Sequence, residues 1–364
     1  MTMTSNSTKN TTMRHDGPVT KVGINGFGRI GRSVLRVGLA RSDIKVVAIN
    51  HTAPTPEALL LALQYDSTHG RNPYFDELSI VDDPSTGAKF LAFAGDRIVL
   101  SSERDPTKLT WDAWGAEYVL ECTGKLTTID AARVHISVGG AKKVIISAPS
   151  KDAKTFVFGV NHGDYSSEMD VVSNASCTTN CLAPIAKVLD KVWGIEAGML
   201  TTVHASTASQ HLLDGFSKKN LRLGRSVANN IIPTSTGAAS AVKLVLPQLE
   251  GKFHGMSVRV PVSNVSMIDL TVTLSRPCST LPTLLDALRA ASKTPELRGV
   301  VHVCEKELVS SDFLGRTETA IVDANACFLL NERMAKVVAW YDNETAYSSK
   351  ALDMARWMHV VDGQ

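Results

Sequence analysis

The chain has 364 residues, of which 44% are hydrophobic and 20% are charged, and its formal net charge at pH 7 is +2. This length predicts two domains, and the small charge argues against nucleic acid or an acidic membrane as the main partner. Six cysteines at irregular spacing indicate neither a disulfide framework nor a zinc site. No apolar run approaches a membrane span. We therefore expect a cytoplasmic protein without a metal.

The N-terminal 20 residues are rich in Ser, Thr and Asn and poor in apolar residues. They contain no hydrophobic segment of the kind that a secretory signal requires. The composition predicts a disordered tail over residues 1–20.

A glycine pattern follows the first predicted strand, residues 19–25. The segment 26–31 reads Gly-Phe-Gly-Arg-Ile-Gly and precedes a predicted helix, and a second strand covers 44–50. This G-x-G-x-x-G motif in a strand–turn–helix context indicates dinucleotide binding, because the glycines allow the tight turn and the close approach of a pyrophosphate. The expected cofactor-binding residues are Asn25, Gly26, Phe27, Gly28, Arg29, Ile30 and Gly31.

The second strand ends in Asn50-His51, where such folds carry an acidic residue that binds the adenosine ribose. Without a carboxylate there, a 2′-phosphate is not repelled. We expect both residues at the cofactor, and the choice between NAD and NADP stays open.

Strands alternate with helices as far as Pro149, which predicts a doubly wound Rossmann-type sheet. Longer strands at 199–205, 253–261 and 265–274 predict an α+β catalytic domain with a mixed or antiparallel sheet. We place the dinucleotide-binding domain at 21–176 and the catalytic domain at 177–342. A helix in 343–364, amphipathic over 348–359, is expected to pack back on the first domain.

The stretch 173–181 reads Ser-Asn-Ala-Ser-Cys-Thr-Thr-Asn-Cys and joins a strand to a helix. Cys177 falls in the first helical turn, where free N–H groups and the helix dipole favour a thiolate. Ser176 and Thr178 flank it and can donate to an anion at the same helix end. We predict that Cys177 is a nucleophile and that Cys181 is a buried structural residue.

The run Ser-Cys-Thr-Thr-Asn-Cys-Leu-Ala-Pro, beginning at Ser176, resembles the active-site signature of phosphorylating glyceraldehyde-3-phosphate dehydrogenases. The resemblance extends from about Lys21 to the C-terminus. It implies oxidation of glyceraldehyde 3-phosphate to 1,3-bisphosphoglycerate with a nicotinamide cofactor and inorganic phosphate, in glycolysis or gluconeogenesis. The implied reaction passes through a cysteine thiohemiacetal and a thioester, in a homotetramer.

The resemblance also implies residue roles. His204 would be the base that pairs with Cys177, while Thr207 and Arg259 would hold the substrate phosphate. The attacking phosphate would be bound by Ser176, Thr178, Arg222, Thr236 and Gly237. The cofactor would further contact Thr123, Gly124, Asn343 and Tyr347.

Several positions depart from the family pattern. The usual Asn-Asp is Asn50-His51 here, and the usual Glu-Trp-Gly-Tyr-Ser is Glu-Thr-Ala-Tyr-Ser over 344–348. The segment 211–216 also differs at two positions where Lys or Pro is usual. These changes surround the expected pocket and suggest a second isoform, with a changed cofactor preference or resistance to a thiol-directed inhibitor.

Two alternatives stay open. An erythrose 4-phosphate dehydrogenase would have the same architecture but would release its product by hydrolysis. A non-enzymatic protein that binds nucleic acid through its dinucleotide fold is the remote alternative.

Overall fold

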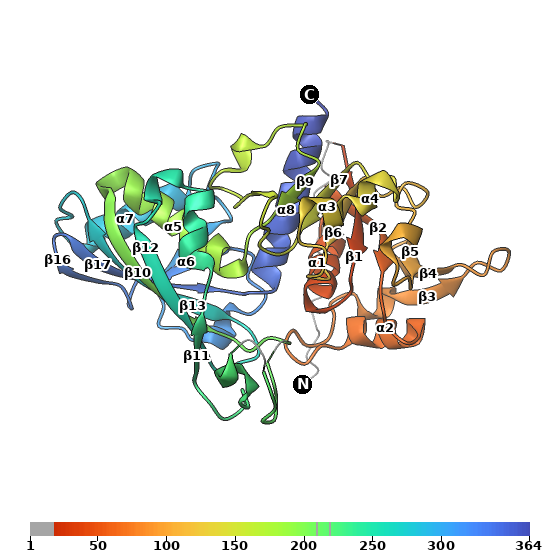
Figure 1. The fold of residues 1–364 in the computed structure, drawn as a ribbon, viewed down its shortest axis with the longest axis horizontal. Coiled ribbons are helices and arrows are strands. Elements are labelled where there is room, and N and C mark those ends of the chain that lie inside the picture. Colours follow the sequence, from red (N-terminus) through yellow and green to blue (C-terminus); the bar gives the residue numbers. More distant parts are fainter. Residues whose placement is uncertain (1–17, 209, 218–219) are drawn as a thin grey trace, which may run out of the picture.

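The computed structural model describes residues 18–208, 210–217 and 220–364 (Figure 1). The expected disordered tail therefore lies outside the described residues, apart from its last three positions. Within the described ranges, no helix is long and apolar enough to cross a bilayer.

The N-terminal half forms a nine-stranded sheet in the order β3-β4-β5-β2-β1-β6-β7-β9-β8. Its strands from β5 to β8 run parallel, while β3 and β4 form an antiparallel edge. The strands are β1 Thr20–Asn25, β2 Ile44–Asn50, β3 Ser79–Asp82, β4 Lys89–Phe93, β5 Asp96–Ser101, β6 Tyr118–Glu121, β7 Lys143–Ile146, β8 Lys154–Thr155 and β9 Val171–Ser173. The strand order on either side of β1 confirms the Rossmann-type, doubly wound expectation.

The helices of this half are α1 Arg29–Leu39, α2 Pro56–Gln64, α3 Ile129–Ala132 and α4 Val134–Ser137. The last helix of the chain, α8 Thr345–Asp362, joins them. Leu352 and Met358 of α8 pack in one core with Val34 and Leu35 of α1. Figure 1 shows α8 between the two halves, and it also contacts α5 of the other half. The expected amphipathic helix is therefore a largely buried one.

The second half forms an eight-stranded mixed sheet in the order β11-β12-β10-β13-β17-β15-β14, with β16 paired to β17. β10 runs parallel to β12 and antiparallel to β13, as the mixed-sheet expectation required. The strands are β10 Ile195–His204, β11 Ile232–Ser235, β12 Phe253–Arg259, β13 Ser266–Leu274, β14 Val301–Cys304, β15 Ala320–Asp323, β16 Phe328–Asn331 and β17 Met334–Tyr341.

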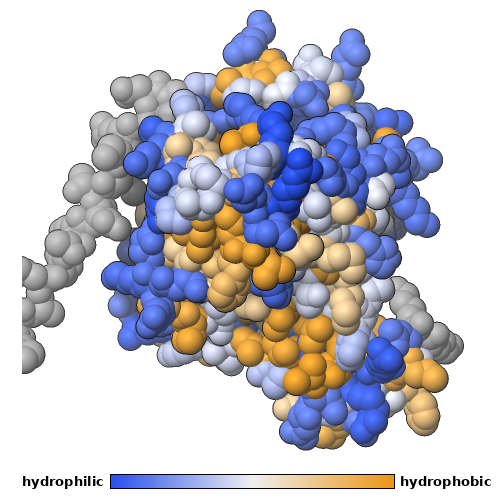
Figure 2. All heavy atoms as spheres, turned by 90° about the vertical axis from the view of Figure 1, so that its left-hand side faces the viewer, coloured by the Kyte–Doolittle hydropathy of each residue, from blue (hydrophilic) through white to orange (hydrophobic). Residues whose placement is uncertain are grey.

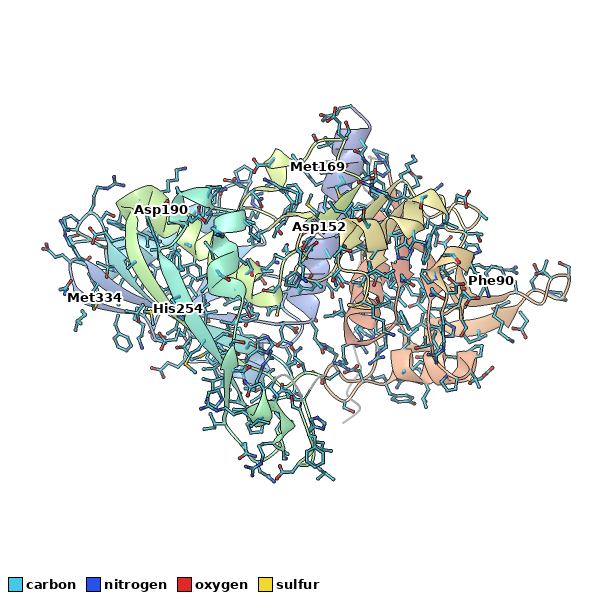
Figure 3. The ribbon with its side chains drawn as sticks, viewed as in Figure 1. Phe90, Asp152, Met169, Asp190, His254 and Met334 are labelled. Carbon is cyan, nitrogen blue, oxygen red and sulfur yellow. The ribbon has the colours of Figure 1, made fainter. Side chains whose placement is uncertain are left out.

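Three helices accompany this sheet: α5 Cys177–Trp193, α6 Ala238–Ala241 and α7 Leu281–Ser292. Apolar residues of α5, Leu182, Ile185 and Leu189 among them, are fully buried in the largest core cluster. The short 3₁₀ helices are η1 Phe75–Glu77, η2 Pro106–Lys108, η3 His162–Asp164, η4 Leu221–Gly224, η5 Val242–Leu244, η6 Pro247–Leu249 and η7 Ser310–Phe313. Figure 3 places Phe90 of β4 and Met334 of β17 at opposite ends of the molecule. The start of α5 lies between those ends.

Candidate active site

Cys177 is the first residue of α5 and follows β9 through a short turn. Ala175 in that turn has a φ of 56°, a backbone conformation that residues other than glycine rarely adopt. The Ser176 hydroxyl caps the helix by accepting a hydrogen bond from the Thr179 amide at 3.1 Å. The Tyr347 hydroxyl donates to the Ala175 carbonyl at 3.1 Å. These contacts fix the backbone on both sides of the sulfur.

His204 faces this sulfur from the end of β10. The distance between Cys177 Sγ and His204 Nε2 is 3.5 Å. In the parallel pairing of β10 with β12, His204 is the register partner of Arg259. The structure therefore brings together a thiol, an imidazole and a guanidinium that are far apart in sequence.

Two arrangements compete for Nδ1 of His204. Nδ1 lies 2.8 Å from the Ala205 carbonyl oxygen, to which a protonated Nδ1 donates. The Arg259 guanidinium also contacts Nδ1, and arginine carries only donors, so that contact requires Nδ1 to accept. One nitrogen cannot do both. The first arrangement leaves the Nε2 lone pair facing sulfur, and the second puts the proton on Nε2.

The surroundings shift both pKa values. Burial raises the pKa of the Cys177 thiol, while the Arg259 charge, the Thr178 hydroxyl and nearby amides oppose that rise. The helix end thus lowers the thiol pKa less than burial raises it. Burial and then the Arg259 charge lower the pKa of His204 to about 4, so the imidazole is neutral at pH 7.

A cavity of about 680 Å³ opens above this pair and spans the two halves of the molecule. Most of the predicted catalytic and substrate residues line it, together with part of the cofactor set. These are Arg29, Ile30, Ser176, Cys177, His204, Thr207, Arg259, Asn343 and Tyr347. Ser147, Ser206 and Ser263 also line this cavity and carried no recognisable signal in the sequence.

A smaller cavity of about 260 Å³ lies on the other side of Cys177. It brings together four of the five residues predicted for the attacking phosphate: Ser176, Thr178, Thr236 and Gly237. Arg222 is not among them, because it lies exposed on η4. Of the residues that the structure describes, Arg259 is the cation that lines this cavity, and it lines the larger cavity as well.

Tyr341 contacts two threonine hydroxyls in the wall of the smaller cavity. Its hydroxyl lies 2.8 Å from the Thr178 hydroxyl and 2.9 Å from that of Thr202. The phenol is fully buried, at 1% exposure. Because Tyr341 stands at the end of a hydrophobic strand, its sequence context is that of an ordinary core aromatic residue.

The glycine motif forms a third cavity, of about 330 Å³. It is lined by Asn25, Gly26, Phe27, Gly28, Asn50, His51 and Thr123 of the predicted set, whereas Gly124 does not line it. Gly26 has a φ of 90°, and a Cβ on Gly31 would lie 2.1 Å from the Gly26 carbonyl oxygen. A Cβ on Gly28 would meet nothing within 4 Å. The cradle before α1, whose first turn lacks a side-chain cap, therefore fits a dinucleotide pyrophosphate.

His51 is buried in this cleft, and its Nδ1 accepts a hydrogen bond from the Ala53 amide at 3.1 Å. Burial lowers its pKa, so the ring stays neutral at pH 7. Arg104 and Lys125 line the same cleft and supply positive charge that no sequence motif indicated.

A buried carboxylate organises the floor of the cleft. Glu121 accepts a hydrogen bond from Asn25 Nδ2 at 2.6 Å and from the Thr123 amide at 2.8 Å. His135 lies 3.0 Å from it, and Asn50 donates to Asn25 at 2.8 Å. The network joins the carboxyl ends of β1, β2 and β6.

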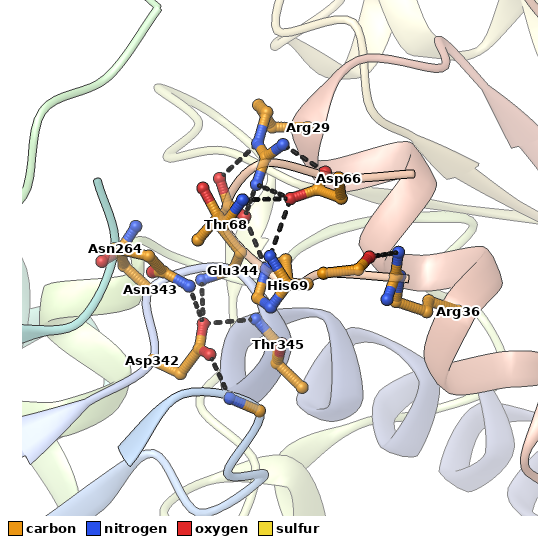
Figure 4. Close-up of polar contacts among 12 residues, drawn as sticks. Arg29, Arg36, Asp66, Thr68, His69, Asn264, Asp342, Asn343, Glu344 and Thr345 are labelled. Carbon is orange, nitrogen blue, oxygen red and sulfur yellow. Dashed lines mark hydrogen bonds and ion pairs between the residues drawn. The ribbon is translucent and has the colours of Figure 1, made fainter. Parts of the chain in front are cut away.

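A second network closes the other side of the glycine motif (Figure 4). Arg29 pairs with Asp66 and with Glu344, both at 2.5 Å, and His69 lies 2.8 Å from Glu344. The sequence pattern around Asp66 and His69 indicated no chemistry for either residue. The described residues contain no group of three or more His, Cys, Asp and Glu side chains arranged to hold a metal ion.

Two family models match the chain. They are the NAD-binding domain of glyceraldehyde 3-phosphate dehydrogenase, over residues 20–129, and the C-terminal domain of the same enzyme, over 176–343. A chloroplastic glyceraldehyde-3-phosphate dehydrogenase of Arabidopsis thaliana is 49% identical, over 94% of this chain and 79% of the relative. The enzyme of Ogataea parapolymorpha and a cytosolic one of Craterostigma plantagineum are each 48% identical, over 93% of this chain and 98% of the relative.

Proposed function

Since the chain belongs to the glyceraldehyde-3-phosphate dehydrogenase family and is an NAD-dependent oxidoreductase, we propose that Cys177 and His204 carry out its chemistry. The observation that carries this proposal is the 3.5 Å contact between Sγ and Nε2 inside the large cavity. A neutral imidazole beside a thiol at a helix start is the arrangement of a nucleophile and its base.

Each step can be assigned to groups of the chain. The Cys177 sulfur adds to the aldehyde carbon of glyceraldehyde 3-phosphate and forms a thiohemiacetal. His204 Nε2 then takes the hydroxyl proton of this adduct. When bound, the nicotinamide cofactor accepts the hydride, which leaves a thioester on the sulfur. Inorganic phosphate attacks the thioester carbonyl, the thiolate leaves, and 1,3-bisphosphoglycerate is released.

We place the substrate phosphate at Thr207 and Arg259 in the large cavity, and the attacking phosphate in the smaller one. Arginine suits the first role because its guanidinium offers paired donors to a phosphate. In the smaller cavity, Ser176, Thr178, Thr236 and Gly237 supply hydroxyl and backbone donors beside the sulfur. Arg222 joins this site only if its loop moves.

Arg259 also links substrate binding to the base. A substrate phosphate that draws the guanidinium away from Nδ1 lets Nδ1 donate to the Ala205 carbonyl, 2.8 Å away. Nε2 then carries the free lone pair that proton transfer requires. The substrate anion thereby selects the active tautomer of His204.

For the cofactor, we propose that Asn25, the glycine motif, Asn50, His51, Thr123, Gly124, Asn343 and Tyr347 bind NAD. NADP is a competitive second cofactor, because His51 carries no negative charge and Arg104 lines the same cleft. A carboxylate at this position would repel a 2′-phosphate.

We further propose that the chain is a second isoform whose pocket is altered, by a changed cofactor preference or by resistance to an inhibitor directed at the thiol. Thr345 and Ala346 are the departures beside Asn343 and Glu344, which line the large cavity. Comparing Cys177 alkylation by bulky and small thiol reagents in the native protein and in Thr345→Trp tests the explanation by inhibitor resistance.

We propose a cytoplasmic homotetramer with domains at 21–176 and 177–342 and the 343–364 helix on the first. Figure 2 shows apolar side chains gathered in the middle and lower parts of the face at the second-sheet end. Large exposed apolar residues on that sheet and on the 210–231 loop support subunit contacts. They are Met199, Leu212, Leu213, Phe216, Leu221, Ile231, Met256, Phe328 and Leu330.

Steady-state assays with and without inorganic phosphate test the reaction assignment. Turnover of glyceraldehyde 3-phosphate that depends on phosphate supports it. Equal rates without phosphate, or a preference for erythrose 4-phosphate, would favour the hydrolytic alternative. A gel shift that persists as salt is raised would favour the nucleic-acid alternative.

A further inference from the structure

A cavity of about 430 Å³ lies outside the active site, between α1, the start of α8 and the segments 69–74 and 315–317. We call it the side cavity. Among the described residues, its walls carry two arginines, one histidine and several hydroxyl groups, and no aspartate or glutamate. This set of donors is typical of a site for an anion.

Arg36 is the cation available in this cavity. It is half-buried, and within the described residues no carboxylate lies within ion-pair distance of it. Its Nη2 donates a hydrogen bond to the Gly70 carbonyl oxygen at 3.3 Å. Arg41, the other arginine of the wall, is by contrast paired with Asp43 at 2.7 Å and Asp353 at 2.5 Å. Burial lowers the pKa of Arg36, and the Asp66 charge opposes this only in part, so a bound anion would offset a remaining desolvation cost.

Ser33 adds a second, independent observation. The residue is 4% exposed and lines the side cavity, and its buried hydroxyl has no hydrogen-bond partner among the described residues. Buried hydroxyl groups in native proteins are almost always paired, so this one indicates a missing partner. Ser33 and Arg36 are three residues apart on α1, so their side chains lie on the same face of the helix.

The rest of the wall limits the ligand. Val37, Ala40, Pro73 and Tyr74 give it an apolar part. We propose that the side cavity binds a small organic anion, a phosphate ester or carboxylate with a compact apolar body, through Arg36 and Ser33. It is distinct from the cavities that hold the substrate and the attacking phosphate.

Residues in the wall of the side cavity contact side chains that lie next to residues of the proposed cofactor site (Figure 4). The backbone amides of two of its residues, Gly315 and Thr345, both donate to the Asp342 carboxylate at 2.8 Å. Asp342 directly precedes Asn343, which lines the active-site cavity. His69, another wall residue, contacts Glu344, which pairs with Arg29 of the glycine motif.

A ligand that shifts Thr345 or His69 therefore acts on Asn343 in the active-site cavity and on Arg29 in the glycine motif. The two affinities are linked by reciprocity. If the bound cofactor changes the affinity of the side cavity for its ligand by some factor, the bound ligand changes the affinity for the cofactor by the same factor. Couplings of this kind are typically worth about fivefold or more in a dissociation constant.

The test is a calorimetric titration of the full-length protein, loaded with NAD and saturated with inorganic phosphate to fill the anion positions at the active site. The probes are phenyl phosphate, benzoate and benzyl alcohol. We expect saturable binding of one phenyl phosphate or benzoate per chain and none of the alcohol. Binding of phenyl phosphate alone would identify a phosphate ester as the natural class, and binding of both would identify the anionic group as sufficient.

Three variants locate the site. Arg36→Gln should weaken phenyl phosphate binding at least tenfold, and Thr345→Trp should abolish it by filling the cavity. Arg298→Gln is the matched control, because Arg298 is exposed and likewise donates to a single backbone carbonyl, that of Lys293, at 3.4 Å. It should bind the probe as the native protein does.

The proposal is overturned if the native protein shows no saturable binding of either anion, or if Arg36→Gln and Thr345→Trp bind phenyl phosphate unchanged. Melting temperature and NAD affinity are measured for each variant. If Arg36→Gln proves misfolded, Thr345→Trp decides the question. Because the readout is binding, the result does not depend on turnover at Cys177.

Discussion

The guanidinium of Arg259 contacts Nδ1 of His204, while Nε2 of the same ring lies 3.5 Å from the Cys177 sulfur. The Arg259 contact therefore bears on which ring nitrogen of His204 carries the proton, while Nε2 faces the sulfur in either case. The β10–β12 register creates this relationship, since it sets residues 204 and 259 side by side at the carboxyl ends of parallel strands.

The first prediction concerns Arg259. Arg259→Gln should raise the KM for glyceraldehyde 3-phosphate about tenfold or more, because a charge-assisted bond worth about 1.5–3 kcal/mol is lost. The KM for an uncharged short aldehyde should change little. Equal effects on both aldehydes would show that Arg259 is structural.

The same variant, Arg259→Gln, should also change the pKa of the Cys177 thiol. The Arg259 charge lowers the pKa of Cys177 against the effect of burial, so Arg259→Gln should raise that pKa. The pH dependence of Cys177 alkylation by iodoacetamide measures it, with Arg298→Gln as the exposed control. An alkylation profile that does not move, or that moves to lower pH, would contradict this electrostatic role.

His204 should act as a neutral general base rather than as a permanently protonated imidazolium. Its pKa of about 4 keeps it neutral, so His204→Asn should lower kcat by about 10²–10⁴-fold through the loss of proton transfer.

Burial of the neutral His204 ring also makes the stability of the native protein depend on pH. The unfolded chain takes up the proton near pH 6.5, so the native protein loses stability as pH falls from about 6.5 to about 4. The melting temperature of His204→Asn should therefore fall less than that of the native protein across this pH range.

Tyr341 should position Thr178 for the attacking phosphate. Tyr341→Phe removes the shared partner of the Thr178 and Thr202 hydroxyls and should cost about 1–3 kcal/mol of stability. If Tyr341 also orients Thr178, the KM for inorganic phosphate rises while the KM for the aldehyde stays close to native. A loss of stability with both KM values unchanged would leave Tyr341 with a packing role only.

His51 should weaken discrimination between the two cofactors without supplying charge. His51→Asp should lower kcat/KM for NADP selectively and leave NAD almost unaffected. Because burial lowers the pKa of His51, NADP use by the native protein should not improve as pH falls from 8 to 6.5. A marked gain over that interval would mean that the ring protonates and pairs with the 2′-phosphate. Negligible NADP use before and after the substitution would show that His51 has no role in selection.

The sequence was enough to place Cys177 at the start of α5 and His204 at the end of β10, because period and turn residues fix local structure. It could not reveal which groups meet through tertiary packing. Tyr341 has the pattern of a core residue, and only the crossing of β17 under α5 shows what its hydroxyl holds. The burial of α8 is limited in the same way, since its periodicity does not show that both α1 and α5 contact it. Arg222 was assigned by motif alone, and its loop places it in solvent.

The most direct test of the central claim is rapid mixing of the NAD-loaded protein with glyceraldehyde 3-phosphate in the absence of inorganic phosphate, followed by mass spectrometry of the intact chain. We predict a burst of one reduced cofactor per active site and an acyl adduct on Cys177, which disappears when phosphate is added. Cys177→Ser should show neither, whereas Cys181→Ser, altered at a fully buried position, should show both. Steady turnover without phosphate, or a burst without an adduct on Cys177, would contradict the account.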